Sequence, residues 1–324
     1  MNLGDSTPLM IAAGLLAGIL LGYVVQRGRF CSHSAVANAT RRDFSLAKGW
    51  ILGVSLASVG LAFLYLLPDT ETLNQGLALR PVPNIVGGLL IGIGMVAAAS
   101  CISGLFWKLG SGMLGAVVGL LGWGFGELAG REILSSGPAV LSSATTVLGD
   151  GEAGTVPGVL GVPAPFVAVP FAVIVFVLVK RSRGPMRLGI GLGITIVAGW
   201  ALAAVSGASF GPSSVGAVVS VADGSPNYWL VAFLVGLVVG AAVAARLRGG
   251  LWIRGESALR YLQLLLGGVL LGAGGWIAGG CTLGHGLSGA AQLNVSSFLV
   301  VAAIIVGVVV TRMLAITLPG RRAR

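Results

Sequence analysis

The chain has 324 residues, of which 56% are hydrophobic and 9% are charged, and its formal net charge is +10. A soluble domain needs about a quarter of its residues charged to cover its surface, so this composition excludes a soluble globular protein. The basic residues lie between apolar stretches and not in a separate polar domain. This excludes a nucleic-acid-binding module and indicates a protein that spans a lipid bilayer.

Nine apolar stretches are long enough to cross about 30 Å of hydrocarbon as helices. Backbone polar groups must be paired inside lipid, and the stretches lack the alternating pattern of barrel strands. We therefore expect an all-α polytopic membrane protein with about nine transmembrane helices plus short broken or re-entrant helices. In chain order the predicted spans are Leu9–Val25, Gly49–Leu67, Asn84–Cys101, Ser111–Ala129, Pro165–Val179, Leu188–Val205, Tyr228–Ala245, Tyr261–Gly280 and Ser296–Leu318.

Every second connection between these stretches is basic, and the alternate connections are acidic. Because short basic loops stay in the cytoplasm, we expect the N-terminus outside and the C-terminus inside. The basic connections contain residues 27–48, Lys108, 180–187, 246–260 and 321–324, and the acidic ones carry Asp69, Glu71, Asp150, Glu152 and Asp223.

A shift of 180 residues aligns two halves of the chain without a gap, placing Gly87–Gly94 on Gly267–Gly274 and Cys101 on Cys281. The shift moves the pattern by five spans, an odd number, so the second repeat is predicted to lie upside down relative to the first. Inverted repeats with a solute path at their interface are typical of transporters. We expect one integral membrane domain made of a first repeat over 1–130, an extracytoplasmic connecting loop over 131–164 and a second repeat over 165–324.

Each of the three cysteines follows the end of an apolar stretch. A free cysteine is commonly a small buried hydrophobe, but Cys101 and Cys281 are equivalent in the two repeats and would approach one central path from its two sides. An odd number of cysteines at opposite faces argues against a structural disulfide. Metal binding would pair Cys31 with His33 or Cys281 with His285, yet transition-metal sites usually have more ligands, so no metal is expected.

Two cysteine motifs carry a family resemblance. The Gly-Arg-Phe-Cys motif at 28–31 and the Gly-Gly-Cys-Thr-x-Gly-His motif at 279–285, with Cys101 between them, closely resemble the YeeE/YedE family of bacterial membrane proteins. The resemblance extends from the first span to about Gly289. It implies uptake of a small sulfur-containing anion, thiosulfate in particular, across the bacterial cytoplasmic (inner) membrane. It also implies a cysteine-lined path and a small cytoplasmic sulfur-carrier protein as partner.

The central motif departs from the pattern, because Ala99-Ser100 precedes Cys101 where Gly279-Gly280 precedes Cys281. Some members of the family are associated with selenium metabolism, so the resemblance leaves the exact solute open.

A bare dianion in hydrocarbon would cost on the order of tens of kcal/mol, so a path for it must supply donors or positive charge. The N-terminal amides of broken helices are suitable donors. Arg29 either attracts the anion or anchors the chain at the cytoplasmic face. The predicted path residues are Cys31, Cys101, Cys281, Arg29, His33, Ser103, Gly104, Thr282, Gly284 and His285.

Other functions stay open at this point: a permease for a selenium species or another sulfur compound, a thiol-based membrane redox enzyme, and a metal permease. The sequence has no haem-attachment motif, no dinucleotide-binding motif in context and no ATP-binding motif. This favours a transporter that is not an enzyme and has no cofactor. Glu127 is the one clear acidic residue within a span. It could serve as a proton site, but its position near the outer end favours an interfacial role.

Overall fold

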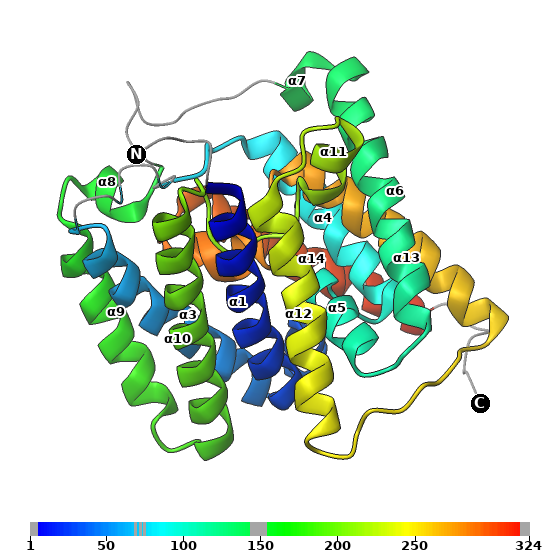
Figure 1. Cartoon of the computed structure of the whole chain (residues 1–324), viewed down its shortest axis with the longest axis horizontal. Coiled ribbons are helices and arrows are strands. Elements are labelled where there is room, and N and C mark those ends of the chain that lie inside the picture. The colour runs from blue at the N-terminus through cyan, green and yellow to red at the C-terminus, as the bar shows by residue number, and fades with distance from the viewer. Residues whose placement is uncertain (1–5, 68–69, 71–72, 74–75, 143–153, 318–324) are drawn as a thin grey trace.

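The computed structural model describes residues 6–67, 70, 73, 76–142 and 154–317, and these residues form a bundle of helices (Figure 1). The described residues contain no strand beyond two isolated β-bridges. The helices are α1 (Ser6–Arg27), α2 (Ser32–Ala39), α3 (Ser45–Leu64), α4 (Pro81–Ala98), α5 (Ile102–Gly110), α6 (Gly115–Ser136), α7 (Ala139–Ser142), α8 (Val156–Leu160), α9 (Ala164–Val179), α10 (Arg183–Ser206), α11 (Ala217–Ala222), α12 (Tyr228–Arg246), α13 (Ala258–Ala278), the π-helix η2 (Gly284–Gly289) and α14 (Val295–Thr317).

The all-helical membrane fold is confirmed, and each predicted span coincides with one long helix. Among the described residues, seven helices are long and apolar enough to cross a membrane. The remaining two are α9, which is apolar but has 16 residues, and α6. Although α6 has 22 residues, its glycines and the charges at Glu127, Arg131 and Glu132 lower its hydropathy.

The predicted short broken helices lie directly after long ones. α2 follows α1, α5 follows α4, and η2 follows α13. Each connection turns through a left-handed backbone conformation, at Arg29 (φ 47°), Ala99 (φ 45°) and Gly279 (φ 77°). Ala99 thus adopts, at some strain, the conformation that glycine supplies without strain at the equivalent position in the second half.

Several element boundaries follow the 180-residue offset, although α2 and α11 do not correspond. The offset places Ala98, the end of α4, on Ala278, the end of α13, and Gly115, the start of α6, on Val295, the start of α14. The most extensive helix contacts form two corresponding sets: α1 packs on α12 as α10 packs on α3, and α6 packs on α13 as α14 packs on α4. These pairings are those expected for two related halves, whose inverted relation stays a prediction.

The charged connections separate between the two ends of the bundle. In Figure 1 the α9–α10 and α12–α13 connections lie at the lower end, while the start of α1, α7, α8 and α11 lie at the upper end. Asp223, after α11, is therefore remote from the basic connections. The acidic residues Asp69, Glu71, Asp150 and Glu152 and the basic tail 321–324 lie outside the described residues.

Glycines allow the long helices to approach backbone to backbone. A Cβ atom built on Gly18 would lie 2.0 Å from the carbonyl oxygen of Phe233, and one on Gly240 would lie 2.1 Å from that of Ile19. The same holds between α6 and α13, where a Cβ on Gly126 would lie 2.1 Å from the carbonyl oxygen of Val269. In lipid, where no hydrophobic force drives helices together, such close packing is a main source of association.

We therefore expect Gly240→Ala to lower the free energy of unfolding by about 1–3 kcal/mol, as in other overpacked cores. The melting temperature of the purified protein should fall accordingly. Gly184→Ala is the matched control, because it is also helical but a Cβ there would meet nothing within 4 Å. Thermal unfolding in detergent measures both variants. Equal stability of the two would contradict the contact between α1 and α12.

Candidate functional site

Two of the three cysteines touch each other. The Sγ atoms of Cys31, at the start of α2, and Cys101, at the start of α5, are 3.1 Å apart. The backbone N–H of Cys101 also donates to Cys31 Sγ at 3.1 Å. Both side chains are buried, with at most 1% of their surface exposed. Two helix breaks that are 70 residues apart in sequence therefore meet at one pair of free thiols.

The predicted path residues Ser103 and Gly104 surround this thiol pair. Ser103 Oγ lies 3.2 Å from Cys101 Sγ, and the N–H of Gly104 donates to the same sulfur at 3.3 Å. A Cβ on Gly104 would lie 2.8 Å from Cys31 Sγ and 2.5 Å from Ser100 Oγ. The position therefore requires glycine, because any side chain would displace the thiols.

The third cysteine, Cys281, lies at the break between α13 and η2 and is fully buried. Its Sγ is 2.9 Å from Ser214 Oγ and accepts from the backbone N–H of Leu283 at 3.2 Å. Beside it, the buried hydroxyl of Thr282 has no hydrogen-bond partner among the described residues. Buried hydroxyls are normally paired, so Thr282 offers a free donor next to the thiol.

The histidines and Arg29 differ in their surroundings. His285 is 1% exposed, with Nδ1 2.9 Å from Ser297 Oγ and Nε2 3.1 Å from the carbonyl oxygen of Ala278. Both ring nitrogens thus hold the break in place, and a role in the path stays a prediction. His33 is buried in α2, whereas Arg29 is exposed at the preceding turn.

The described residues contain no group of three or more His, Cys, Asp or Glu side chains that could hold a metal ion. The breaks place thiols, hydroxyls, backbone amides and the His285 imidazole close together.

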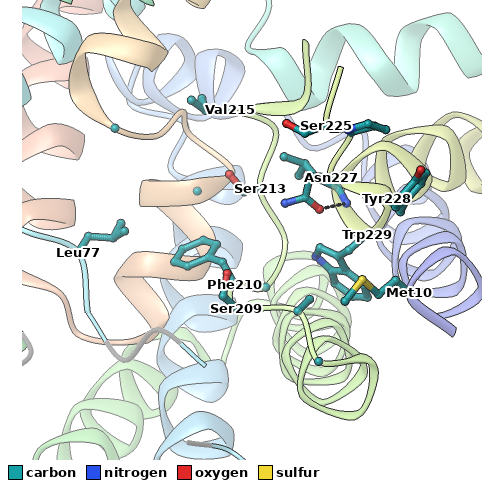
Figure 2. Close-up of a pocket in the computed structure, with 17 residues that line it drawn as sticks. Met10, Leu77, Ser209, Phe210, Ser213, Val215, Ser225, Asn227, Tyr228 and Trp229 are labelled. Carbon is teal, nitrogen blue, oxygen red and sulfur yellow. Dashed lines mark hydrogen bonds between the residues drawn. The ribbon is translucent and has the colours of Figure 1, made fainter. Parts of the chain in front are cut away.

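A cavity of about 600 Å³ lies at the upper end of the bundle, and its lining includes Gly279 and Gly284, which flank Cys281 in sequence. Figure 2 shows Phe210 and Ser213 on one wall and Asn227 and Trp229 on the other. The lining contains hydroxyl and amide groups but no acidic side chain. Its lining also includes Ser213, adjacent in sequence to the thiol partner Ser214, and Gly284 of η2. This outer cavity therefore combines polar and apolar groups and borders the segments that carry Ser214 and Cys281, although neither of these two residues lines it.

A second cavity of about 730 Å³ lies at the opposite end, between α1, α3 and α10. Its basic lining consists of Arg27, Arg187 and Arg248. The 180-residue offset relates part of its lining to the outer cavity, since it places Gly28 on Ala208 and Ser45 on Ser225. Among the described residues that line this inner cavity, Gly28 alone belongs to a cysteine-bearing break.

Some functional neighbours were missed by sequence reasoning. The 180-residue offset places Ser34, three positions after Cys31, on Ser214, and this alignment is the available signal for the place of Ser214 beside a cysteine. Glu127 was expected at the interface, but it is fully buried. Its carboxylate accepts from the backbone N–H groups of Gly216 and Val218, so it fixes the segment that follows Ser214.

Comparison with known proteins agrees with the motifs. Residues 27–310 match the family described as sulphur transport. The chain belongs to this family. It is 33% identical over 323 residues to the thiosulfate transporter TsuA of Spirochaeta thermophila, covering 90% of this chain and 94% of the relative. It is 27% identical over 353 residues to the thiosulfate transporter TsuA of Escherichia coli K12, covering 97% of both chains. The family resemblance seen in the cysteine motifs is confirmed.

The contact between Cys31 and Cys101 predicts selective oxidation. Diamide should convert this pair to an intramolecular disulfide with loss of two hydrogen atoms and leave Cys281, whose sulfur contacts a serine hydroxyl, reduced. Peptide mass spectrometry after alkylation of the remaining thiols measures the outcome, with Cys31→Ser as the control that cannot cross-link. A disulfide between Cys281 and either other cysteine would contradict the arrangement.

Proposed function

We propose that this protein takes up a small sulfur-containing anion, most specifically thiosulfate, across the bacterial cytoplasmic membrane. The observation that carries the proposal is the outer cavity, whose lining includes Ser213, the neighbour of Ser214, and Gly279 and Gly284, which flank Cys281 in sequence. Membership of the sulphur transport family and the names of both relatives support the choice of solute. The alternation of basic and acidic connections supports an outward-facing N-terminus and an inward-facing C-terminus.

The path runs from the outer cavity past Cys281 and Thr282 to the thiol pair of Cys101 and Cys31. The anion loses water on leaving the cavity and gains donors from the hydroxyl of Thr282, the thiols and the amides of the broken helices. A thiol is a weak donor and a polarisable neighbour for a sulfur atom. Weak contacts at successive sites suit conduction, because the ion must leave each site as readily as it enters.

In this mechanism the protein is a transporter and not an enzyme, and the mechanism requires neutral thiols, because a thiolate would repel the anion. A small cytoplasmic sulfur-carrier protein would receive the ion at the basic inner end, where the inner cavity is lined by three arginines. A permease for a selenium species would use the same donors.

The close thiol pair also favours a second candidate, a thiol-based redox function in which Cys31 and Cys101 cycle between dithiol and disulfide by thiol–disulfide exchange with an external partner, whose own disulfide is reduced to two thiols as theirs forms. Such a function needs a sulfur atom at both positions, so serine substitution of either cysteine would abolish it.

Growth of a sulfate-uptake-deficient bacterium on thiosulfate as sole sulfur source tests the proposed function. The parent protein should restore growth, and Cys281→Ala should restore much less because it removes a thiol donor from the proposed path. Failure of an expressed parent protein would reject thiosulfate as the solute and direct the test to selenium or other sulfur species. Equal growth with both proteins would remove Cys281 from the mechanism.

Serine substitution separates passive conduction from sulfur chemistry. Because serine keeps a hydroxyl donor, Cys281→Ser should retain part of the thiosulfate flux into proteoliposomes, and Cys281→Ala should retain less. Complete and equal loss in both variants would contradict a hydrogen-bonded path and favour a covalent relay. Antibody detection of each variant in the membrane controls for expression.

A further inference from the structure

Each helix break that carries a repeat-equivalent cysteine is approached by one arginine from the other half of the chain. Arg80 stands directly before α4, and Arg260 lies in the first turn of α13. The 180-residue offset places Arg80 on Arg260, and both residues are partly buried. Anchoring arginines at span ends normally extend into water, so two partly buried ones at equivalent positions call for another role.

Arg260 binds the end of α4, directly before Cys101. Its guanidinium donates to the carbonyl oxygens of Ala97, at 2.9 Å, and Ala98. The ammonium of Lys108 donates to the carbonyl oxygen of Ala99 at 2.9 Å. A helix C-terminus carries about half a negative charge and would repel an anion. Two cations bound to these carbonyls reverse the sign of the local charge beside the thiol pair.

Arg80 lies at the corresponding end of α13. A Cβ built on Gly279 would be 2.9 Å from Arg80 Nη2, so the guanidinium lies against a residue that lines the outer cavity, two positions before Cys281. The last carbonyl of α13, that of Ala278, already accepts from Asn84 Nδ2 at 2.9 Å and is 3.1 Å from His285 Nε2. Arg80 is not itself a lining residue of the outer cavity, so its charge would act on the cavity through its contact with Gly279.

We propose that Arg80 and Arg260 are specificity-determining residues that select a doubly negative oxyanion, Arg80 at the outer approach to the cysteines and Arg260 at the inner one. The inference rests on the proposed function and identifies the fixed charges that serve it. Both sites keep their charge at every physiological pH, because an arginine does not deprotonate there. Arg80 acts in capture from the outer cavity, and Arg260 acts in passage beyond Cys281.

Equilibrium binding of radiolabelled thiosulfate to the purified full-length protein tests Arg80. Arg80→Gln should raise the Kd by about tenfold or more, as expected for the loss of one charge-assisted hydrogen bond. Arg80→Lys keeps the charge and should raise the Kd less. The matched control is Arg131→Gln, which removes one positive charge at the same end of the bundle, where Arg131 pairs with Asp223, and should leave the Kd unchanged.

Competition between unlabelled anions gives a readout that a purely structural role would not change. With the parent protein, divalent sulfate should displace thiosulfate at a lower concentration than monovalent nitrate does. Arg80→Gln should narrow this difference, and Arg80→Lys should preserve it. In proteoliposomes, Arg80→Gln should raise the KM for uptake, whereas Arg260→Gln should lower the maximal rate.

An unchanged Kd in folded Arg80→Gln, or an equal rise in Arg131→Gln, would overturn the inference even if the parent protein transports thiosulfate. Conversely, a parent that binds thiosulfate through Arg80 but carries none into proteoliposomes would reject the proposed function and support the anion site. If Arg80→Gln does not fold, Arg80→Lys decides: retained sulfate preference supports the inference and lost preference overturns it.

Discussion

The structure depends on one constraint, which is that backbone groups released at a helix break inside a bilayer must find partners within the protein. Three breaks bring the cysteines into the bundle, and each exposes carbonyls on one side and amides on the other. The carbonyl of Ala278 is satisfied by Asn84 and His285, and those of Ala97 and Ala98 by Arg260. The amides of Gly104 and Leu283 meet the sulfurs of Cys101 and Cys281. The carbonyls at these breaks are thus occupied by side-chain donors, and the amides hold the cysteine sulfurs in place beside the proposed path.

The glycines make this arrangement sterically accessible. Close backbone contacts such as those of Gly18 and Gly240 hold α1 against α12, and their counterparts hold α6 against α13. A rigid frame of this kind is needed if the short helices are to keep the two sulfurs in contact. Gly104 lies beside them, and a Cβ atom there would collide with Cys31 Sγ and Ser100 Oγ. The same residue type therefore has two roles, one in packing the frame and one in giving space to the thiols.

Much of the fold could be predicted from the sequence, because length and hydropathy determine which segments can cross a membrane. The short helices at the cysteines followed from Gly, Ser and Thr at the ends of apolar stretches. The sequence could not reveal that Cys31 touches Cys101 while Cys281 meets Ser214, since these pairings depend on which helix ends converge. Arg80 was overlooked because a single arginine before a span is typical of simple anchoring. Glu127 was misplaced because hydropathy gives depth in the membrane but not which side of a helix faces protein.

The arginines of the inner cavity carry an energetic consequence for net uptake. Moving a dianion into a cell that is negative inside by about 100 mV costs about 5 kcal/mol against the electric field, twice the value for a single charge. Fixed positive charges at Arg27, Arg187 and Arg248 lower the energy of the ion only while it lies beside them, so they speed its arrival without changing the final distribution. With the path as proposed, accumulation must come from elsewhere, either from a coupled ion or from chemistry in the cytoplasm that removes the anion as it emerges.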